Sequence, residues 1–177
     1  LTATLATSLW SRLMTENTEK TETIIKIDAR VTGFSNDQTR LISLCFPDTG
    51  EIIVQKIELF TTLPVRADQQ ADTIVVTDSP NLIQNWQLKF DAKEHLEEVI
   101  RVYLASYRAE LVEFETSLER YNPMNILQVR KIDKNGPQQE FDSSSLTNGH
   151  IAALISIWAT HKISVAHAVT SRETVKE

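Results

Sequence analysis

Residues 91–121 read DAKEHLEEVIRVYLASYRAELVEFETSLERY and give the strongest structural signal in the chain. Asp91 with Glu94 three positions later matches the capping box that begins many helices. Apolar residues then recur at steps of three and four, which is the spacing of one helix face. They are Leu96, Ile100, Tyr103, Tyr107, Leu111, Phe114, Leu118 and Tyr121. Because Pro123 stops a helix shortly afterwards, the sequence predicts one uninterrupted helix over 91–121.

The part of the chain that precedes this helix has the pattern of strands. Apolar and charged residues alternate over 22–31, which predicts a half-buried strand. Further strands are expected at 40–46 and 51–60, and the Pro-Asp-Thr-Gly turn at 47–50 would join them as an antiparallel hairpin. Residues 73–77 are β-branched throughout and predict a fourth strand.

The part that follows the helix predicts a hairpin and a second helix. An Asn-Gly turn separates expected strands at 126–132 and 138–141. Residues 146–162 are mostly apolar and predict a buried helix. Strands and helices do not alternate, so the expected class is α+β. The predicted architecture is an antiparallel sheet, made of an N-terminal meander plus a C-terminal hairpin, packed against one long helix and a buried C-terminal helix.

The 177 residues are expected to form one α+β domain over 21–169 with a polar tail at 170–177. Residues 1–20 have two interpretations. They form an N-terminal tail or docking helix, or they include translated sequence upstream of a native start at Met14. No stretch fits a transmembrane helix, so no membrane partner is expected.

Charge and cysteine content narrow the expected surroundings of the protein. The chain has 24 acidic and 18 basic residues and a formal net charge of −6. An acidic chain repels the phosphate backbone, which disfavours nucleic acid as a partner. The single cysteine, Cys45, lies in an apolar run and is expected to be a buried core residue in a cytoplasmic protein.

The sequence contains no motif that identifies a catalytic, cofactor or metal site. Its four glycines are isolated, so no phosphate loop or dinucleotide-binding fingerprint is expected. The histidine spacing does not match a zinc site. Serines 143–145 with His150 are the nearest approach to an acyl-transfer site, but serines before a helix usually cap it. A hydrolase with dispersed active-site residues remains an alternative.

Two surfaces are the candidates for binding. The first is a nucleic-acid face on the N-terminal meander, in which aromatic rings stack on bases beside basic residues. Its basic residues are Lys26, Arg30, Arg40 and Lys56, and its aromatic residues are Phe34, Phe46 and Phe60. The second is a protein interface on the long helix, for which self-association is one use. Its residues are Tyr103, Tyr107, Phe114 and Tyr121.

The sequence therefore favours a small cytosolic non-catalytic binding or assembly protein, with no catalytic, cofactor or metal residues assigned. Its size and composition suit an accessory protein of a phage or mobile element. A protein partner or self-association is expected. The alternatives are a nucleic-acid-binding accessory protein that uses the sheet face, and the dispersed-site hydrolase.

Overall fold

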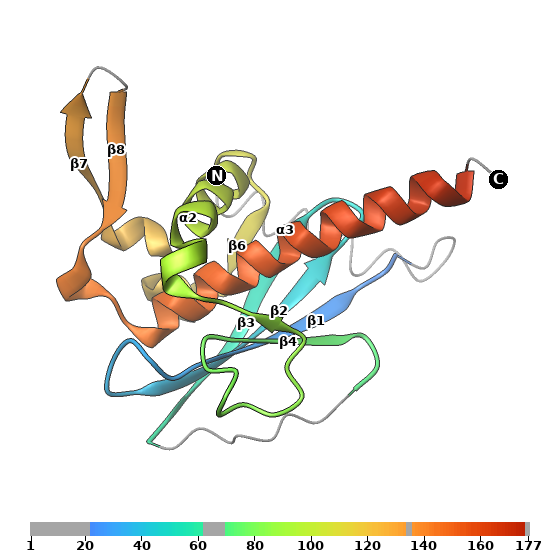
Figure 1. Ribbon diagram of the computed structural model, residues 1–177, viewed down its shortest axis with the longest axis horizontal. Helices are drawn as coiled ribbons and strands as arrows, with labels where there is room; N and C mark the ends of the chain where they lie inside the picture. The colour runs from blue at the N-terminus through green and yellow to red at the C-terminus, as the bar shows by residue number, and fades with distance from the viewer. Residues whose placement is uncertain (1–21, 62–69, 134–135, 176–177) are drawn as a thin grey trace.

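The computed structural model describes residues 22–61, 70–133 and 136–175. In these residues a six-stranded sheet carries one long helix, α3, across one face, and a shorter helix, α2, packs against α3 (Figure 1). The predicted α+β class is confirmed. The predicted tail or docking helix at 1–20 lies outside the described residues.

The centre of the sheet is the predicted antiparallel meander. Its strands are β1 (Ile25–Val31), β2 (Gln38–Phe46) and β3 (Glu51–Phe60). The turn between β2 and β3 closes through a hydrogen bond of 2.8 Å from the Gly50 amide to the Phe46 carbonyl. Gly50 has a φ of 80°, a conformation that glycine adopts without a steric penalty.

Three short strands join the meander in parallel, so the sheet is mixed. They are β4 (Thr73–Thr77) beside β1, β5 (Leu88–Lys89) beside β4, and β6 (Val112–Phe114) beside β3. The strand order is β5-β4-β1-β2-β3-β6. An alternating pattern reveals a strand but not its neighbour, which is why the sequence did not reveal these parallel pairings.

The core lies between the sheet and α3 (Asn148–Val175). Residues 151–160 of α3 are all buried, and Ile27, Ala29 and Val31 of β1 face them without exposure. Burying each such large aliphatic side chain contributes about 1.5–3 kcal/mol. The helix is longer than the predicted 146–162 segment, and it includes most of the predicted polar tail at 170–177.

The prediction of one helix over 91–121 is wrong. Helix α2 (Ala92–Arg108) begins as predicted, with the Asp91 side chain accepting a hydrogen bond from the Lys93 amide at 2.9 Å, but it ends at Arg108. Glu110 there has a φ of 59°. The chain then forms β6 and the 3-10 turns η1 (Thr116–Tyr121) and η2 (Pro123–Ile126).

The apolar residues continue at steps of three and four past this break, because β6 and η1 also direct side chains into the core. Phe114 points inward from a strand, while Leu118 and Tyr121 lie three residues apart on a 3-10 turn. A spacing of three residues suits a 3-10 turn as well as an α-helix. The periodicity alone therefore could not reveal the break after Arg108.

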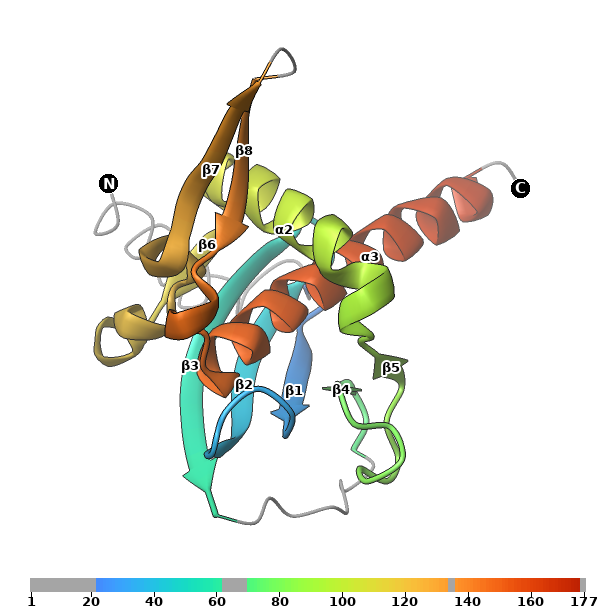
Figure 2. The ribbon, with the colours of Figure 1, turned by 60° about the vertical axis from the view of Figure 1, so that its left-hand side comes forward.

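The C-terminal hairpin forms a separate two-stranded sheet. Its strands are β7 (Leu127–Asp133) and β8 (Gly136–Phe141), and the short turn η3 (Ser143–Ser145) leads from it to α3. The hairpin extends away from the main sheet, and almost all its contacts are between its own two strands (Figures 1 and 2). It is therefore not part of the sheet that α3 covers.

Candidate functional site

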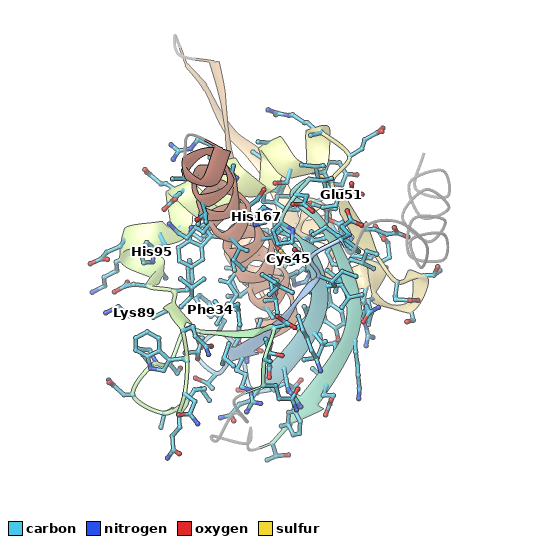
Figure 3. The ribbon with its side chains drawn as sticks, turned by 90° about the vertical axis from the view of Figure 1, so that its right-hand side faces the viewer. Phe34, Cys45, Glu51, Lys89, His95 and His167 are labelled. Atoms are coloured by element: carbon cyan, nitrogen blue, oxygen red, sulfur yellow. The ribbon has the colours of Figure 1, made fainter. Side chains whose placement is uncertain are left out.

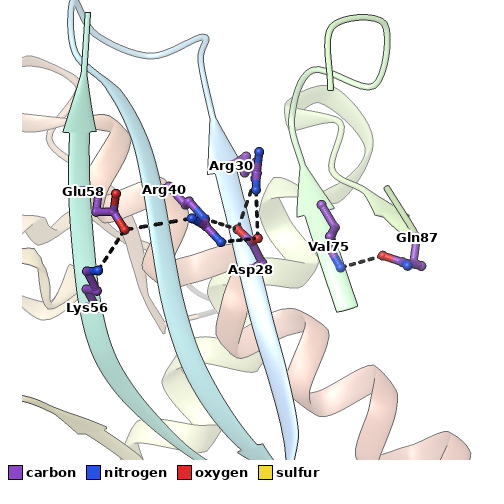
Figure 4. A network of polar contacts seen from close by, with 7 residues as sticks. All are labelled: Asp28, Arg30, Arg40, Lys56, Glu58, Val75 and Gln87. Carbon is purple, nitrogen blue, oxygen red and sulfur yellow. Dashed lines mark hydrogen bonds and ion pairs between the residues drawn. The ribbon is translucent and has the colours of Figure 1, made fainter. Parts of the chain in front are cut away.

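Asp28 lies at the centre of a polar network on the sheet face opposite α3 (Figure 4). Its carboxylate accepts hydrogen bonds from Nε and Nη2 of Arg30 at 3.3 and 3.1 Å. It accepts two more from Nε and Nη2 of Arg40, both at 3.1 Å. Asp28 and Arg30 are only 4% and 3% exposed. Two planar guanidinium groups thus hold one carboxylate in a fixed position.

The network continues across the sheet to β3. Nη1 of Arg40 lies 4.0 Å from Oε1 of Glu58, and Nζ of Lys56 lies 3.2 Å from the same oxygen. Exposure rises along this row, from the buried Arg30 to Lys56, whose side chain is 66% exposed. The charges of the face are therefore largely paired with one another.

The structure brings the four basic residues predicted for a nucleic-acid face onto the same side of adjacent strands. Lys26 and Arg30 belong to β1, Arg40 to β2 and Lys56 to β3. Arg30 is buried, however, and Arg40 is bound to Asp28 and Glu58. A phosphate would have to displace a carboxylate from either arginine, which leaves Lys26 and Lys56 as its most accessible contacts.

The three phenylalanines predicted for this face do not form a stacking platform. Phe46 is fully buried and packs with Ile53, while Phe60 packs against a small cluster that contains Val75. Phe34 packs partly against the main core. Base stacking requires exposed rings, which excludes Phe46, while Phe34 and Phe60 are each partly covered by a different cluster.

Three of the four residues predicted for a protein interface lie inside the fold. Tyr103, Phe114 and Tyr121 are buried in the main core, and only Tyr107 is exposed. The Tyr103 hydroxyl donates a hydrogen bond of 2.6 Å to Oδ1 of Asn122. Burial raises the pKa of Tyr103, so this hydroxyl keeps its proton. Tyr103 is buried from within α2, whereas Phe114 and Tyr121 follow the break after Arg108 and reach the core from β6 and η1.

Among the described side chains, Ser144, Ser145 and His150 do not assemble into an acyl-transfer site. The hydroxyls of Ser144 and Ser145 donate to the Asp142 carboxylate at 2.7 and 2.9 Å, which lowers the pKa of Asp142. His150 instead contacts the Thr147 hydroxyl at 2.8 Å. Burial lowers the pKa of His150. Asp142 therefore caps η3, and the Thr147 hydroxyl accepts a hydrogen bond of 3.3 Å from the His150 amide at the start of α3.

A second Ser, His and Asp set lies where α3 meets the β2–β3 turn. His167 approaches Asp48 with Nε2 2.5 Å from Oδ1, and the Ser164 hydroxyl donates to the Pro47 carbonyl at 2.7 Å. His167 lies on the side of the helix that faces this turn (Figure 3). A catalytic serine donates its proton to the imidazole, whereas this hydroxyl is bound to a carbonyl. We therefore infer that these contacts hold α3 against the β2–β3 turn.

The β6 edge of the sheet carries a cluster of carboxylates. Glu51 begins β3, Glu113 lies in β6, and Glu115 follows β6. Glu113 is 5% exposed, and its Oε2 has no hydrogen-bond partner among the described residues. Burial first, and then the charges of Glu115 and Glu51, raise the pKa of Glu113. This cluster destabilises the charged form of Glu113.

Cys45 and the metal-binding residue types give no further site. Cys45 is fully buried, and burial raises the pKa of its thiol to about 11 (Figure 3). Such a thiol stays protonated and is a poor nucleophile. Over 22–61, 70–133 and 136–175, no three His, Cys, Asp or Glu side chains gather in a way that could hold a metal ion.

Among the described helices, none has both the length and the apolar content needed to cross a membrane.

The comparisons with known proteins give one distant structural likeness. No protein-family model and no curated protein matches the sequence. One similar solved structure is the crystal structure of the large terminase nuclease from thermophilic phage G20c. The TM-score is 0.47 at 12% identity, over 77% of this chain and 87% of that one. Similarity at this level supports no argument about function.

Sequence reasoning missed both the central role of Asp28 and the parts of the chain that project from the fold. Asp28 is one charge in an alternating strand, and only the pairing of β1 with β2 brings Arg40 to it. The full length of α3 was missed because the dense run of apolar residues ends near Lys162, where the helix begins to leave the core. The available signal was that no Gly or Pro follows Lys162, so nothing in 163–175 breaks the helix.

Proposed function

We propose that this protein is a small non-catalytic binding or assembly protein that acts by holding other macromolecules. The observation that carries the proposal is the β7–β8 hairpin, which extends from the main sheet with almost all its contacts inside itself. A lone two-stranded hairpin is only marginally stable in water. Its outer edges can pair with a further strand. A partner that binds there would stabilise the hairpin.

The way the charged residues are used supports the same proposal. Asp28 is enclosed by Arg30 and Arg40, and His167 is held against Asp48. These side chains stabilise the fold through contacts with each other. The small size of the chain also suits an accessory protein of a phage or mobile element, which we include in the proposal.

Site-specific photo-crosslinking in the native host tests the role of the hairpin. A photo-reactive amino acid is placed at Gln138 in β8, and a matched control carries it at Arg101, which is exposed on α2. We expect a discrete adduct of higher mass from position 138 only. Equal adducts from both positions, or none from position 138, would count against a hairpin-mediated binding function.

The second candidate function is nucleic-acid binding on the sheet face. It is favoured by the four basic residues that share one side of β1, β2 and β3, of which Lys56 is the most exposed. The test is fluorescence anisotropy of a single-stranded oligonucleotide at low salt. If this function holds, the Lys26→Ala/Lys56→Ala double variant weakens binding and the control Lys89→Ala/Lys93→Ala does not. Equal affinities would remove this candidate.

A further inference from the structure

We propose that residues 1–21 of this chain dock on the sheet face opposite α3, over an apolar patch at one end of the meander. This inference goes beyond the proposed function, because it concerns a contact within the chain rather than a partner of the hairpin. The patch, which we call the β2–β3 patch, is formed by four side chains. They are Ile24, Leu44, Phe46 and Ile53.

Strand register places the β2–β3 patch on the face of the sheet that carries Asp28. Lys26 lies two residues before Asp28 and therefore on the same side of β1. Lys26 pairs directly with Leu44, and Leu44 pairs directly with Ile53. Directly paired residues share a face, so the patch lies on the side away from α3. Cys45, the next residue along β2, belongs to the main core instead.

The β2–β3 patch is buried, although its described members come only from β2, β3 and the residues that lead into β1. Phe46 and Ile53 are 0% and 1% exposed. Neighbouring strands shield a side chain from the sides, but complete burial on a sheet face requires a further layer above it. The helices α2 and α3 both pack into the main core on the other face. A segment other than these two helices therefore covers the patch.

Residues 1–21 are attached to the fold beside the β2–β3 patch. The described chain begins at Glu22, and Ile24 is itself a member of the patch. The polar residues 14–21 can span up to about 26 Å. The three strand spacings from β1 to β6 amount to about 14 Å, so residues 1–13 can reach every part of the patch. An attached segment also has a high effective concentration and needs little affinity of its own.

The sequence of residues 1–13 suits an apolar surface. Its leucines recur at steps of four, which is the spacing of one helix face. A helix of this length is marginal in water by itself, so the pattern favours one that forms against the body of the protein. The leucines of this row are Leu1, Leu5, Leu9 and Leu13.

Charge supports the same occupant. Glu113 of β6 pairs with Ile53, so the carboxylate cluster at the β6 edge lies directly beside the β2–β3 patch. Arg12 is the only charged residue among residues 1–15. It lies three residues after Leu9, on the side of the leucine row. A docked segment therefore brings a guanidinium group toward an edge that carries negative charge, which favours binding there.

Photo-crosslinking within the full chain tests the docking. A diazirine analogue of leucine is placed at position 9, and a matched control carries it at Thr7, which lies across the predicted helix from the leucine row. Mass spectrometry then maps the site of insertion. We expect insertion within one chain into residues 44–53 from position 9, at several times the yield from position 7. Equal yields, no insertion into 44–53 from position 9, or insertion only between two copies overturns the inference.

Exposure of the β2–β3 patch gives an independent measurement. The Leu5→Asp/Leu9→Asp variant should release the segment and raise the fluorescence of an apolar dye such as ANS several-fold, with the far-UV circular dichroism of the sheet retained. The control Ala3→Asp/Thr7→Asp adds the same charges on the other side of the predicted helix and should leave the fluorescence unchanged. Equal fluorescence in both variants overturns the inference.

If the Leu5→Asp/Leu9→Asp variant does not keep its fold, the photo-crosslinking result decides, because it leaves the leucine row almost unchanged. The proposed function is tested separately at Gln138, so the two can fail independently.

Discussion

The Asp28 carboxylate is taken out of water but keeps charged partners on both of its oxygens. Removing one member of a buried ion pair leaves the others desolvated and unpaired, which typically costs 3–5 kcal/mol. We expect Asp28→Asn to lower the free energy of unfolding by about that amount, since Arg30 would remain buried. Urea unfolding measures the change.

Glu58→Gln is the matched control for this prediction, because Glu58 belongs to the same network but is partly exposed. Ion pairs at the surface contribute about 0–1 kcal/mol. If the two variants lose similar stability, the central role of Asp28 in the network is wrong.

Unlike Asp28, which is bound by two arginines, Glu113 lies near other carboxylates. Its buried Oε2 has no partner among the described residues. The pKa of Glu113 is raised above the ordinary value of 4.5, so the folded state binds its proton more tightly than the unfolded state. Its contribution to stability is therefore complete below pH 4.5 and is lost as the pH rises through the folded-state pKa.

Glu113→Gln should consequently stabilise the protein at neutral pH by on the order of 1 kcal/mol, because no charge remains to be buried. The gain should shrink as the pH falls toward 4.5. Thermal unfolding of both proteins across this pH range provides the measurement. Glu115→Gln, at an exposed neighbouring position, should change stability much less. A gain that does not depend on pH would contradict the prediction.

At the scale of elements, the end of α2 is a Schellman motif without its usual glycine. The Leu111 amide donates to the Ser106 carbonyl at 3.0 Å, and the Glu110 amide donates to the Tyr107 carbonyl at 3.1 Å. Glu110 takes the left-handed position, with a φ of 59°. A residue with a Cβ is strained in this conformation by roughly 1–2 kcal/mol. Glycine removes that strain, but it loses more conformational entropy on folding, which offsets part of the gain.

Glu110→Gly should therefore raise the free energy of unfolding by about 0.5–1 kcal/mol. Chemical denaturation can measure this difference. Ala109→Gly is the control, because Ala109 has a φ of −81° and gains nothing from glycine. Were both variants equally destabilised, the strain at Glu110 would be disproved.

The same helix end shows how far the sequence could predict the fold. Local signals placed the meander, the β2–β3 turn and the start of α2, because alternation, turn residues and caps act between near neighbours. The end of α2 depends on a long-range contact, the hydrogen bond of 2.9 Å from the Ile52 amide to the Leu111 carbonyl. No nearby residue encodes that pairing, so it could not be predicted.

For the candidate surfaces, too, the sequence could predict some features and not others. Alternation alone predicted that Lys26, Arg30, Arg40 and Lys56 would share a face, and the structure places them on one. That Arg30 is buried and that Arg40 binds Asp28 depends on strand register and on what covers the face. The exposure of Val165 and Val169 on α3 depends on where α2 ends its contact with α3, which periodicity cannot locate.

At the scale of the whole molecule, stability should differ sharply between the sheet core and the hairpin. The strands β1 and β2 pack under α3, whereas β7 and β8 contact almost only each other. Amides open with the free energy of the unit to which they belong. Native-state hydrogen exchange should therefore protect β1 and β2 by the global free energy of unfolding and β7 and β8 by far less. Equal protection in both regions would contradict this view.

The order of β1, β2 and α3 along the chain has a consequence for how the sheet is made. While a ribosome is still producing the residues before Asn148, β1 and β2 can already pair, but Ile27, Ala29 and Val31 have nothing to cover them. Such a nascent sheet exposes an apolar layer that promotes aggregation. Chaperone demand should therefore be greatest while the residues between β2 and α3 are being made.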